Sequence, residues 1–254
     1  MIIRKSAREI ERMAEAGAVV AGTHELLREH IRPGVTTGEL DRIAEEFIRS
    51  HGGEPTFKGY RGYPAAICTS PNDMVVHGIP GRYELVEGDI LSVDVGVTLG
   101  GLVADSATTF PVGEISNEAE SLLQACEAAL AAGIEQARSG NRVGDISAAV
   151  QRITEEAGFS VVRQLVGHGV GRTMHEEPQI PNFGEPGRGP ALQEGMTLAI
   201  EPMITAGRPG IFLADDQWSI STEDASLSAH FEHTVAVTKD GPRILTLIEA
   251  GLLR

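Results

Sequence analysis

Four acidic residues of this chain stand in segments that are otherwise apolar and typical of buried strands. They are Asp94, Asp105, Glu201 and Glu232. A carboxylate buried in such a segment costs free energy unless it is paired or binds a cation. One acid of this kind is explained by a salt bridge or an exposed strand face, but four in related positions are not. Converging carboxylates would raise one another's pKa, and a pair of divalent cations removes that repulsion. The pattern therefore predicts a metal site.

A histidine could complete such a site, and His168 is the candidate. His168 stands in Gly167-His168-Gly169, after a strand expected over residues 161–166, and its glycine neighbours let the backbone pack close to the metal centre. His175 follows seven residues later, but His175-Glu176 does not continue to the second histidine of a zincin motif. His77 lies in a loop and is ambiguous by itself.

Helices and strands that position these residues are visible in the apolar spacing. The spacing predicts a helix over residues 10–31 and another from Thr36, where Thr36 and Glu39 form a capping-box pattern, to Gly52-Gly53. Residues 85–97 predict a turn and a buried strand, Gly100-Gly101 a hairpin turn, and residues 103–112 a second strand. Another helix is expected over residues 117–137.

The second half of the chain resembles the first. Glycine and apolar positions between residues 34 and 52 recur 106 residues later, and the segment that ends at Asp94 recurs 107 residues later, ending at Glu201. We interpret this as one α/β domain, residues 1–254, made of two halves, about 1–112 and 113–254, around a pseudo-twofold axis. Each half would deliver a pair of carboxylates to the same central place.

Composition limits the functions that this chain can have. The net charge is −15, from 21 Lys and Arg against 36 Asp and Glu, so binding to DNA, RNA or an anionic membrane is not expected. Two cysteines build neither a disulfide framework nor a cysteine-rich zinc site, which favours a reduced, cytoplasmic protein. The first residues lack the apolar core of a signal peptide, and no run of 18 apolar residues predicts a membrane span.

Several long motifs resemble those of the type I methionine aminopeptidases. They are ICTSPNDMVVHGIP, GHGVGRTMHEEP, EGMTLAIEPM and SLSAHFEHTVAVT, in that order along the chain. The resemblance covers essentially the whole sequence and is closest to the short bacterial form. It implies the pita-bread α/β fold, in which two related halves surround a curved antiparallel sheet.

The same resemblance implies a set of five ligands for two divalent ions, Co, Mn, Fe or Zn. Asp94 would chelate one ion, Asp105 and Glu232 would bridge both, and His168 and Glu201 would complete the other site. A hydroxide held between two ions would attack the scissile carbonyl. Glu201 would move its proton to the leaving amine, His175 would donate to the carbonyl oxygen, and His77 would contact the peptide backbone or help the proton transfer.

An apolar pocket for a methionine side chain is implied as well. Its residues would be Phe57, Tyr60, Tyr63, Cys68, Met174 and Trp218. The chain departs from many relatives at Phe57, where cysteine is common, at Met174, where phenylalanine is common, and at His230, where glutamine is common. These departures affect the shape of the pocket and leave the metal ligands unchanged.

The resulting hypothesis is an aminopeptidase that removes the initiator methionine from nascent chains whose second residue is small. The resemblance also implies a transient contact with the ribosome, and a monomer is the simplest assembly. Two alternatives stay open at this stage: an Xaa-Pro aminopeptidase or prolidase, which shares the fold and metal set, and a metal-free binding protein on the same fold.

Overall fold

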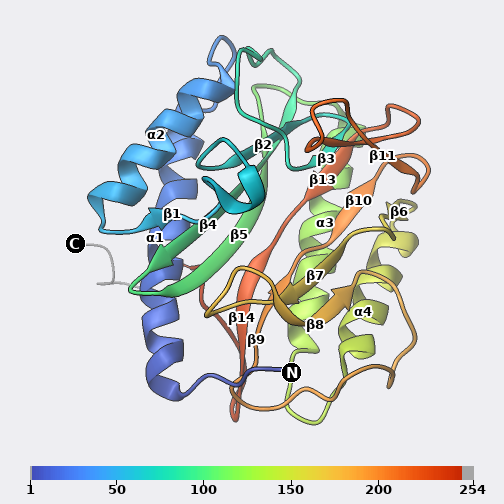
Figure 1. Cartoon of the computed structure of the whole chain (residues 1–254). Coiled ribbons are helices and arrows are strands. Elements are labelled where there is room, and N and C mark those ends of the chain that lie inside the picture. Colours follow the sequence, from blue (N-terminus) through green and yellow to red (C-terminus); the bar gives the residue numbers. More distant parts are fainter. Residues whose placement is uncertain (1, 248–254) are drawn as a thin grey trace.

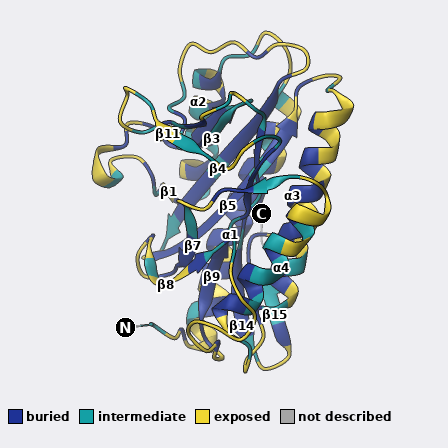
Figure 2. Ribbon diagram, turned by 90° about the vertical axis from the view of Figure 1, so that its right-hand side faces the viewer, coloured by how far each residue is buried: buried dark blue, intermediate teal, exposed yellow. Residues whose placement is uncertain are grey.

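The computed structural model describes residues 2–247 and has mixed α/β architecture with antiparallel sheets (Figure 1). Its helices are α1 (Ala7–His30), α2 (Thr37–Ser50), α3 (Asn117–Glu135) and α4 (Val143–Glu156), with a short 3-10 turn at Tyr60–Gly62. Figures 1 and 2 together show α3 and α4 side by side on the back of the molecule, behind the strands. Buried residues concentrate on the strands and on the inner faces of the helices (Figure 2).

Two capping boxes begin the helices of the first half. Ser6 and Glu9 bond reciprocally at the start of α1, which explains why this helix begins three residues before the predicted start. Thr36 and Glu39 do the same for α2, which confirms the predicted cap. The second helix ends at Ser50, and Gly52 follows its C-cap residue His51 with a φ of 74°, a left-handed conformation that suits glycine.

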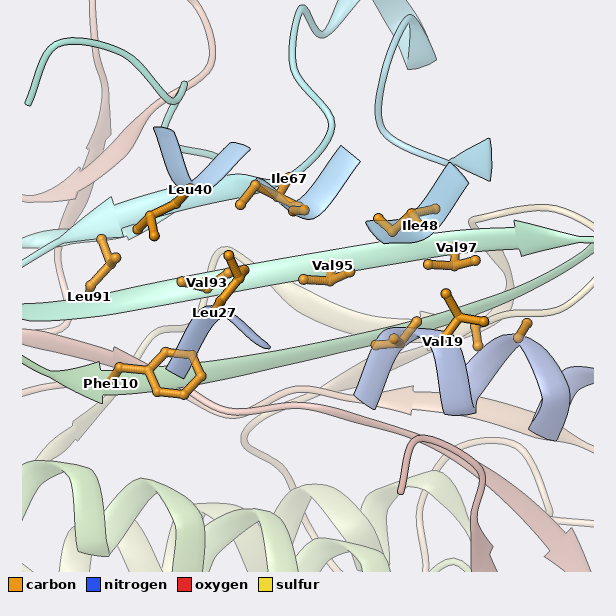
Figure 3. Close-up of a cluster of buried hydrophobic side chains, with 14 of the residues drawn as sticks. Val19, Leu27, Leu40, Ile48, Ile67, Leu91, Val93, Val95, Val97 and Phe110 are labelled. Carbon is orange, nitrogen blue, oxygen red and sulfur yellow. The ribbon is translucent and has the colours of Figure 1, made fainter. Parts of the chain in front are cut away.

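The hairpin of β4 (Ile90–Leu99) and β5 (Leu102–Pro111) is the longest paired element of the first half, and it confirms the predicted turn at Gly100-Gly101. Alternate side chains of β4 face α1 and α2, where Val93, Val95 and Val97 are fully buried (Figure 3). Because side chains alternate along a strand, Asp94 points to the opposite face of the hairpin.

The second half pairs two long, interrupted strands. The first is β9 (Thr197–Ile200) followed by β10 (Met203–Thr205), and the second is β13 (Ser228–His230) followed by β14 (His233–Thr238). Pairing of β9 with β14 and of β10 with β13 places the two interruptions opposite each other. Pro202 lies in the first interruption, where it lacks the N–H that a ladder requires.

The remaining strands complete the sheets. They are β1 (Glu54–Pro55), β2 (Cys68–Pro71), β3 (Met74–Val76), β6 (Ser160–Val161), β7 (Val166–Gly169), β8 (Glu176–Pro181), β11 (Ile211–Leu213), β12 (Ile220–Thr222) and β15 (Gly241–Ile244). Around β4 the pairing runs β1-β4-β2 with β5 beside β4, and in the second half it runs β15-β14-β9-β7-β8.

The prediction of a single strand over residues 161–166 is wrong. Ser160–Val161 pairs with β10, whereas Val166–Gly169 pairs with β8 and β9. Residues 162–165 cross between these two sheets, so they cannot belong to one ladder, and His168 lies within a strand rather than after it.

The division into two related halves of one domain stays a prediction, and its last positions, 248–254, lie outside the described residues. Along residues 2–247, no helix has both the length and the apolar character that crossing a membrane requires.

The packing of α1 against β4 predicts a large loss of stability on truncation of Leu27. This side chain is fully buried among the valines of β4 and the apolar residues of α2. We expect Leu27→Ala to lower the free energy of unfolding by about 2–5 kcal/mol. Urea unfolding followed by circular dichroism measures it. Leu213→Ala is the control, since that side chain is 53% exposed and its truncation should cost less than about 0.5 kcal/mol. Equal losses in the two variants would contradict this packing.

Candidate metal centre

The β4–β5 hairpin places two carboxylates on one face. Asp94 is opposite Ala107 and Asp105 is opposite Gly96, so both acids stand on the face turned away from α1 and α2. Asp105 is fully buried, whereas Asp94 is half-buried. The period of the strand is therefore what brings these two side chains together.

Glu201 and Glu232 lie in the interruptions of the second-half strands. Backbone bonds tie both interruptions to the rest of the site: Asn182 Nδ2 donates to the Glu201 carbonyl at 2.9 Å, and the Glu232 N–H donates to the Ala107 carbonyl at 2.9 Å. The Asp105 N–H donates to Thr234 Oγ1 at 2.9 Å, which joins β5 to β14. The four acids thus reach one centre from both halves of the chain.

His168 is held so that one ring nitrogen faces the acids. Its Nδ1 lies 2.9 Å from the carbonyl of Gly169, which accepts the Nδ1 proton and leaves the Nε2 lone pair free. This Nε2 is 3.4 Å from Glu201 Oε1 and 3.9 Å from Asp105 Oδ2. A Cβ atom at Gly167 or Gly169 would collide with a neighbouring carbonyl oxygen, so the glycines permit this close packing.

The donor set fits a divalent metal centre. One ligand atom from each of Asp105, His168 and Glu232 lies within 4.8 Å of the others. Among the described residues, one oxygen of each of the four carboxylates is buried without a hydrogen-bond partner, as is Nε2 of His230. Buried polar atoms are normally satisfied, and carboxylate oxygens together with an imidazole are ligands that Mn, Fe, Co and Zn accept.

Without a cation, the carboxylates are under strong electrostatic strain. Burial raises the pKa of Asp94 to about 7. Burial, followed by the charges of Glu232 and Asp94, raises the pKa of Asp105 well above its usual range. The pKa values of Glu201 and Glu232 are raised for the same reasons, burial first and neighbouring carboxylates second.

Two further histidines border the centre. The rings of His175 and His168 are 4.3 Å apart, and Tyr60 Oη lies 2.8 Å from His175 Nδ1. His77 is in the loop after β3, as predicted, with a φ of 62° that is uncommon for a residue other than glycine. Burial lowers the pKa of both imidazoles, to about 4 at His77, and the Arg61 charge lowers the pKa of His175 further. Both imidazoles are therefore neutral near pH 7.

A cavity of about 270 Å³ opens beside the acids, and every residue predicted for the site lines it. Its apolar wall consists of Phe57, Tyr63, Cys68, Met174 and Trp218. The Tyr63 ring meets those of Trp218 and Phe57 edge-on at 5.1 and 6.4 Å. Phe57 packs on Gly96 of β4, where a Cβ would come within 2.7 Å of the ring.

Several lining residues were missed by the sequence reasoning. They are Arg61, Val76, Gln164, Leu165, Val166 and Met203. Gln164 and Leu165 belong to the crossing segment that was expected to be a strand. Met203 could have been found, because it follows Glu201 by two residues on the adjoining strand. His230, noted for its type, lines the cavity with its Nε2 3.8 Å from Glu201 Oε2.

Residues 11–239 match the family model of metallopeptidase family M24. The methionine aminopeptidase of Clostridium perfringens is 54% identical over 98% of this chain and 100% of its own length, and methionine aminopeptidase 1 of Bacillus subtilis is 50% identical with the same coverage.

Solved structures of methionine aminopeptidases have the same fold as this chain. The crystal structure of methionine aminopeptidase from Rickettsia prowazekii has a TM-score of 0.96 and 42% identity, covering 97% of this chain and 100% of that one. The prolidase from Pyrococcus furiosus has a TM-score of 0.77 at 22% identity and covers 97% of this chain but 66% of its own, a likeness of fold alone. The pita-bread fold expected from the sequence is thereby confirmed.

The raised carboxylate pKa values predict how stability depends on pH. A carboxyl group whose pKa is raised in the folded state binds more protons folded than unfolded, so the free energy of unfolding falls as pH rises. We expect metal-stripped protein to lose stability as the pH rises through 7, where Asp94 titrates, and further above it, because the pKa values of the other three carboxylates are also raised. Saturating Mn²⁺ should flatten this dependence, because bound ions keep the carboxylates charged in the folded state. Urea unfolding across this range, with Asp105→Asn as the comparison, measures it. An equal slope with and without metal would contradict the assignment.

Proposed function

The chain belongs to metallopeptidase family M24 and, within it, to the methionine aminopeptidases, and from this membership we propose that it removes the N-terminal methionine from polypeptides by metal-dependent hydrolysis. The observation that carries the proposal is the cluster of unpartnered carboxylate oxygens beside an apolar cavity. The first supplies a cation site and the second a place for an uncharged side chain.

We propose two divalent ions, held by Asp94, Asp105, His168, Glu201 and Glu232. Four carboxylates are more than one ion needs to balance its charge, and the acids approach from both halves of the chain, which supports two ions rather than one. When bound, such ions polarise the scissile carbonyl and lower the pKa of a coordinated water. One imidazole with four carboxylates suits Mn, Fe, Co and Zn.

Glu201 is the group proposed to move the proton. Its carboxylate borders the cavity, beside the place proposed for the scissile carbonyl. A carboxylate in that position can take a proton from the attacking water and then release it to the leaving amine. The bond from Asn182 to its backbone carbonyl holds Glu201 in place for both steps.

His175 is proposed to stabilise the negative charge that develops on the carbonyl oxygen. If the Tyr60 hydroxyl donates to Nδ1, the proton of neutral His175 sits on Nε2, which becomes a donor at the mouth of the cavity. His77, on the same cavity, is proposed to contact the peptide backbone of the substrate or to assist the proton transfer.

The apolar wall is proposed to accept the methionine side chain. Met174 and Cys68 offer polarisable contacts, and Trp218 with Tyr63 and Phe57 gives the pocket its aromatic side. A cavity of about 270 Å³ suits one side chain, which supports cleavage after a single terminal residue. We further propose that the second substrate residue is small.

The natural substrates are proposed to be the N-termini of nascent chains, with a transient contact at the ribosome. We propose that the protein is a monomer and that it works in the cytoplasm; the two free, buried cysteines support the second of these, because a reducing compartment keeps thiols unpaired. Prolidase activity rests on a likeness of fold alone and is the alternative that a substrate test distinguishes.

Peptide hydrolysis tests the function directly. Metal-stripped protein, reloaded with Mn, Co, Fe or Zn separately, should release methionine from methionyl-alanyl-serine and should leave methionyl-leucyl-serine and alanyl-proline intact. Chromatography of the products measures the release. Cleavage of alanyl-proline would instead support a prolidase, and no cleavage with any metal, in folded protein, would support a metal-free binding role.

Two substitutions separate metal binding from carbonyl activation. Asp105→Asn should abolish hydrolysis and weaken metal binding measured by calorimetry. His175→Ala should keep the metal affinity and lower kcat by about 10²–10³-fold, the cost of removing one donor to a developing oxyanion. His30→Ala, on α1 and outside the cavity, is the control and should have wild-type kcat. Loss of metal binding in His175→Ala would contradict the division of roles.

A further inference from the structure

A buried ion pair joins the N-terminal arm, residues 2–6 before α1, to the turn that carries His175. Lys5 Nζ lies 2.5 Å from Glu176 Oε2, and the two side chains are only 1% and 3% exposed. This burial is unusual in the protein. Within residues 2–247, each of the other ion pairs between a lysine or arginine and an acid has at least one side chain that is more than 20% exposed. The two residues are 171 positions apart in the sequence, and Glu176 directly follows His175.

Glu176 uses its second oxygen to close the turn. Its Oε1 accepts from the backbone N–H of Arg172 at 2.7 Å and of Thr173 at 3.2 Å. Thr173 Oγ1 donates in turn to the His175 carbonyl at 3.2 Å. The carboxylate of Glu176 therefore determines the path of the backbone on which His175 stands.

Lys5 is fixed by its own surroundings. Its N–H donates to the Gly195 carbonyl at 2.6 Å, on the approach to β9. Its side chain packs on Gly171, where a Cβ would collide with Lys5 Cε, and the Gly171 carbonyl accepts from the Val103 N–H at 2.7 Å. In Figure 1 the arm crosses the lower part of the second-half strands, near the β9 label, and leads into the lower end of α1. Lys5 is thus held in place by its backbone bond and its packing, and its ammonium group contacts the turn that carries His175.

Stability alone does not account for this pair. Two apolar side chains of similar size often stabilise a fold as well as a buried ion pair does, because burial of the charges carries a desolvation cost. Apolar side chains cannot accept the two N–H groups of the turn. A carboxylate can, and a buried carboxylate needs an adjacent cation to stay charged.

We propose that Lys5 and Glu176 are positioning residues, which hold the 172–176 turn so that His175 faces the carbonyl oxygen of the substrate. The proposal rests on the proposed function of His175. Neither residue lines the cavity, so both act through the turn.

Three variants test the proposal: Lys5→Met, Glu176→Gln, and the double variant Lys5→Met/Glu176→Met. The double variant replaces the pair with apolar side chains and leaves no buried charge unpaired, so its melting temperature should lie above that of Lys5→Met. Arg42→Met is the control, because Arg42 and Glu46 form an exposed pair on α2.

We expect kcat for methionyl-alanyl-serine to fall by about 10²-fold in Lys5→Met and in the double variant, since misplacing a catalytic group by about 1 Å has a cost of this order. KM and the calorimetric Mn²⁺ affinity should stay close to wild type, and Glu176→Gln should lose less. In a His175→Ala background, Lys5→Met should lower kcat no further. Arg42→Met should match wild type throughout.

Amide hydrogen exchange of the 172–176 turn gives a readout that needs no activity. Exchange there should quicken about tenfold or more in Lys5→Met and in the double variant, because the two N–H groups lose their acceptor or its support. If wild-type protein cleaves no peptide, the proposed function fails while this exchange result still decides whether the pair holds the turn. Recovery of kcat together with stability in the double variant would overturn the proposal, as would unchanged exchange or an equal loss of kcat in the His175→Ala background.

Discussion

The structure depends on one electrostatic constraint: four carboxylates converge in the interior of a small protein. Taking such charges out of water is costly, and their mutual repulsion adds to the cost. Burial and neighbouring charges raise the pKa values of all four acids, and one oxygen of each is buried without a hydrogen-bond partner among the described residues. Bound cations satisfy these oxygens and remove the repulsion. The fold is therefore built around a site that is complete only with its metal.

The strands position the four carboxylates at this site, and the apolar packing of the helices stabilises the rest of the chain. Alternation along β4 gives one face to the valines that pack against α1 and α2 and the other face to Asp94. The opposed interruptions in the second-half strands present Glu201 and Glu232 without long loops, and bonds from β5 join both halves. Neutral histidines and an apolar cavity then surround the acids, an arrangement suited to hydrolysis at the end of a peptide chain.

Local signals made part of this predictable from the sequence. The acid within an apolar strand, the glycines beside His168 and the capping box at Thr36 each follow from short-range chemistry, and the structure places the predicted site residues on one cavity. The crossing at residues 162–165 was missed because an apolar run has the same pattern whether it stays in one sheet or moves between two. The contact of Lys5 with Glu176 joins positions 171 residues apart, and no local pattern specifies it.

Counting the protons released when metal binds tests the central claim most directly. Mn²⁺ would be titrated into metal-stripped protein near pH 7 by calorimetry, in two buffers of different ionisation enthalpy. If the buried carboxylates form the metal site, binding displaces protons from them, and the measured heat differs between the buffers by the corresponding amount. Heat that is independent of the buffer, or the absence of binding, would contradict the account.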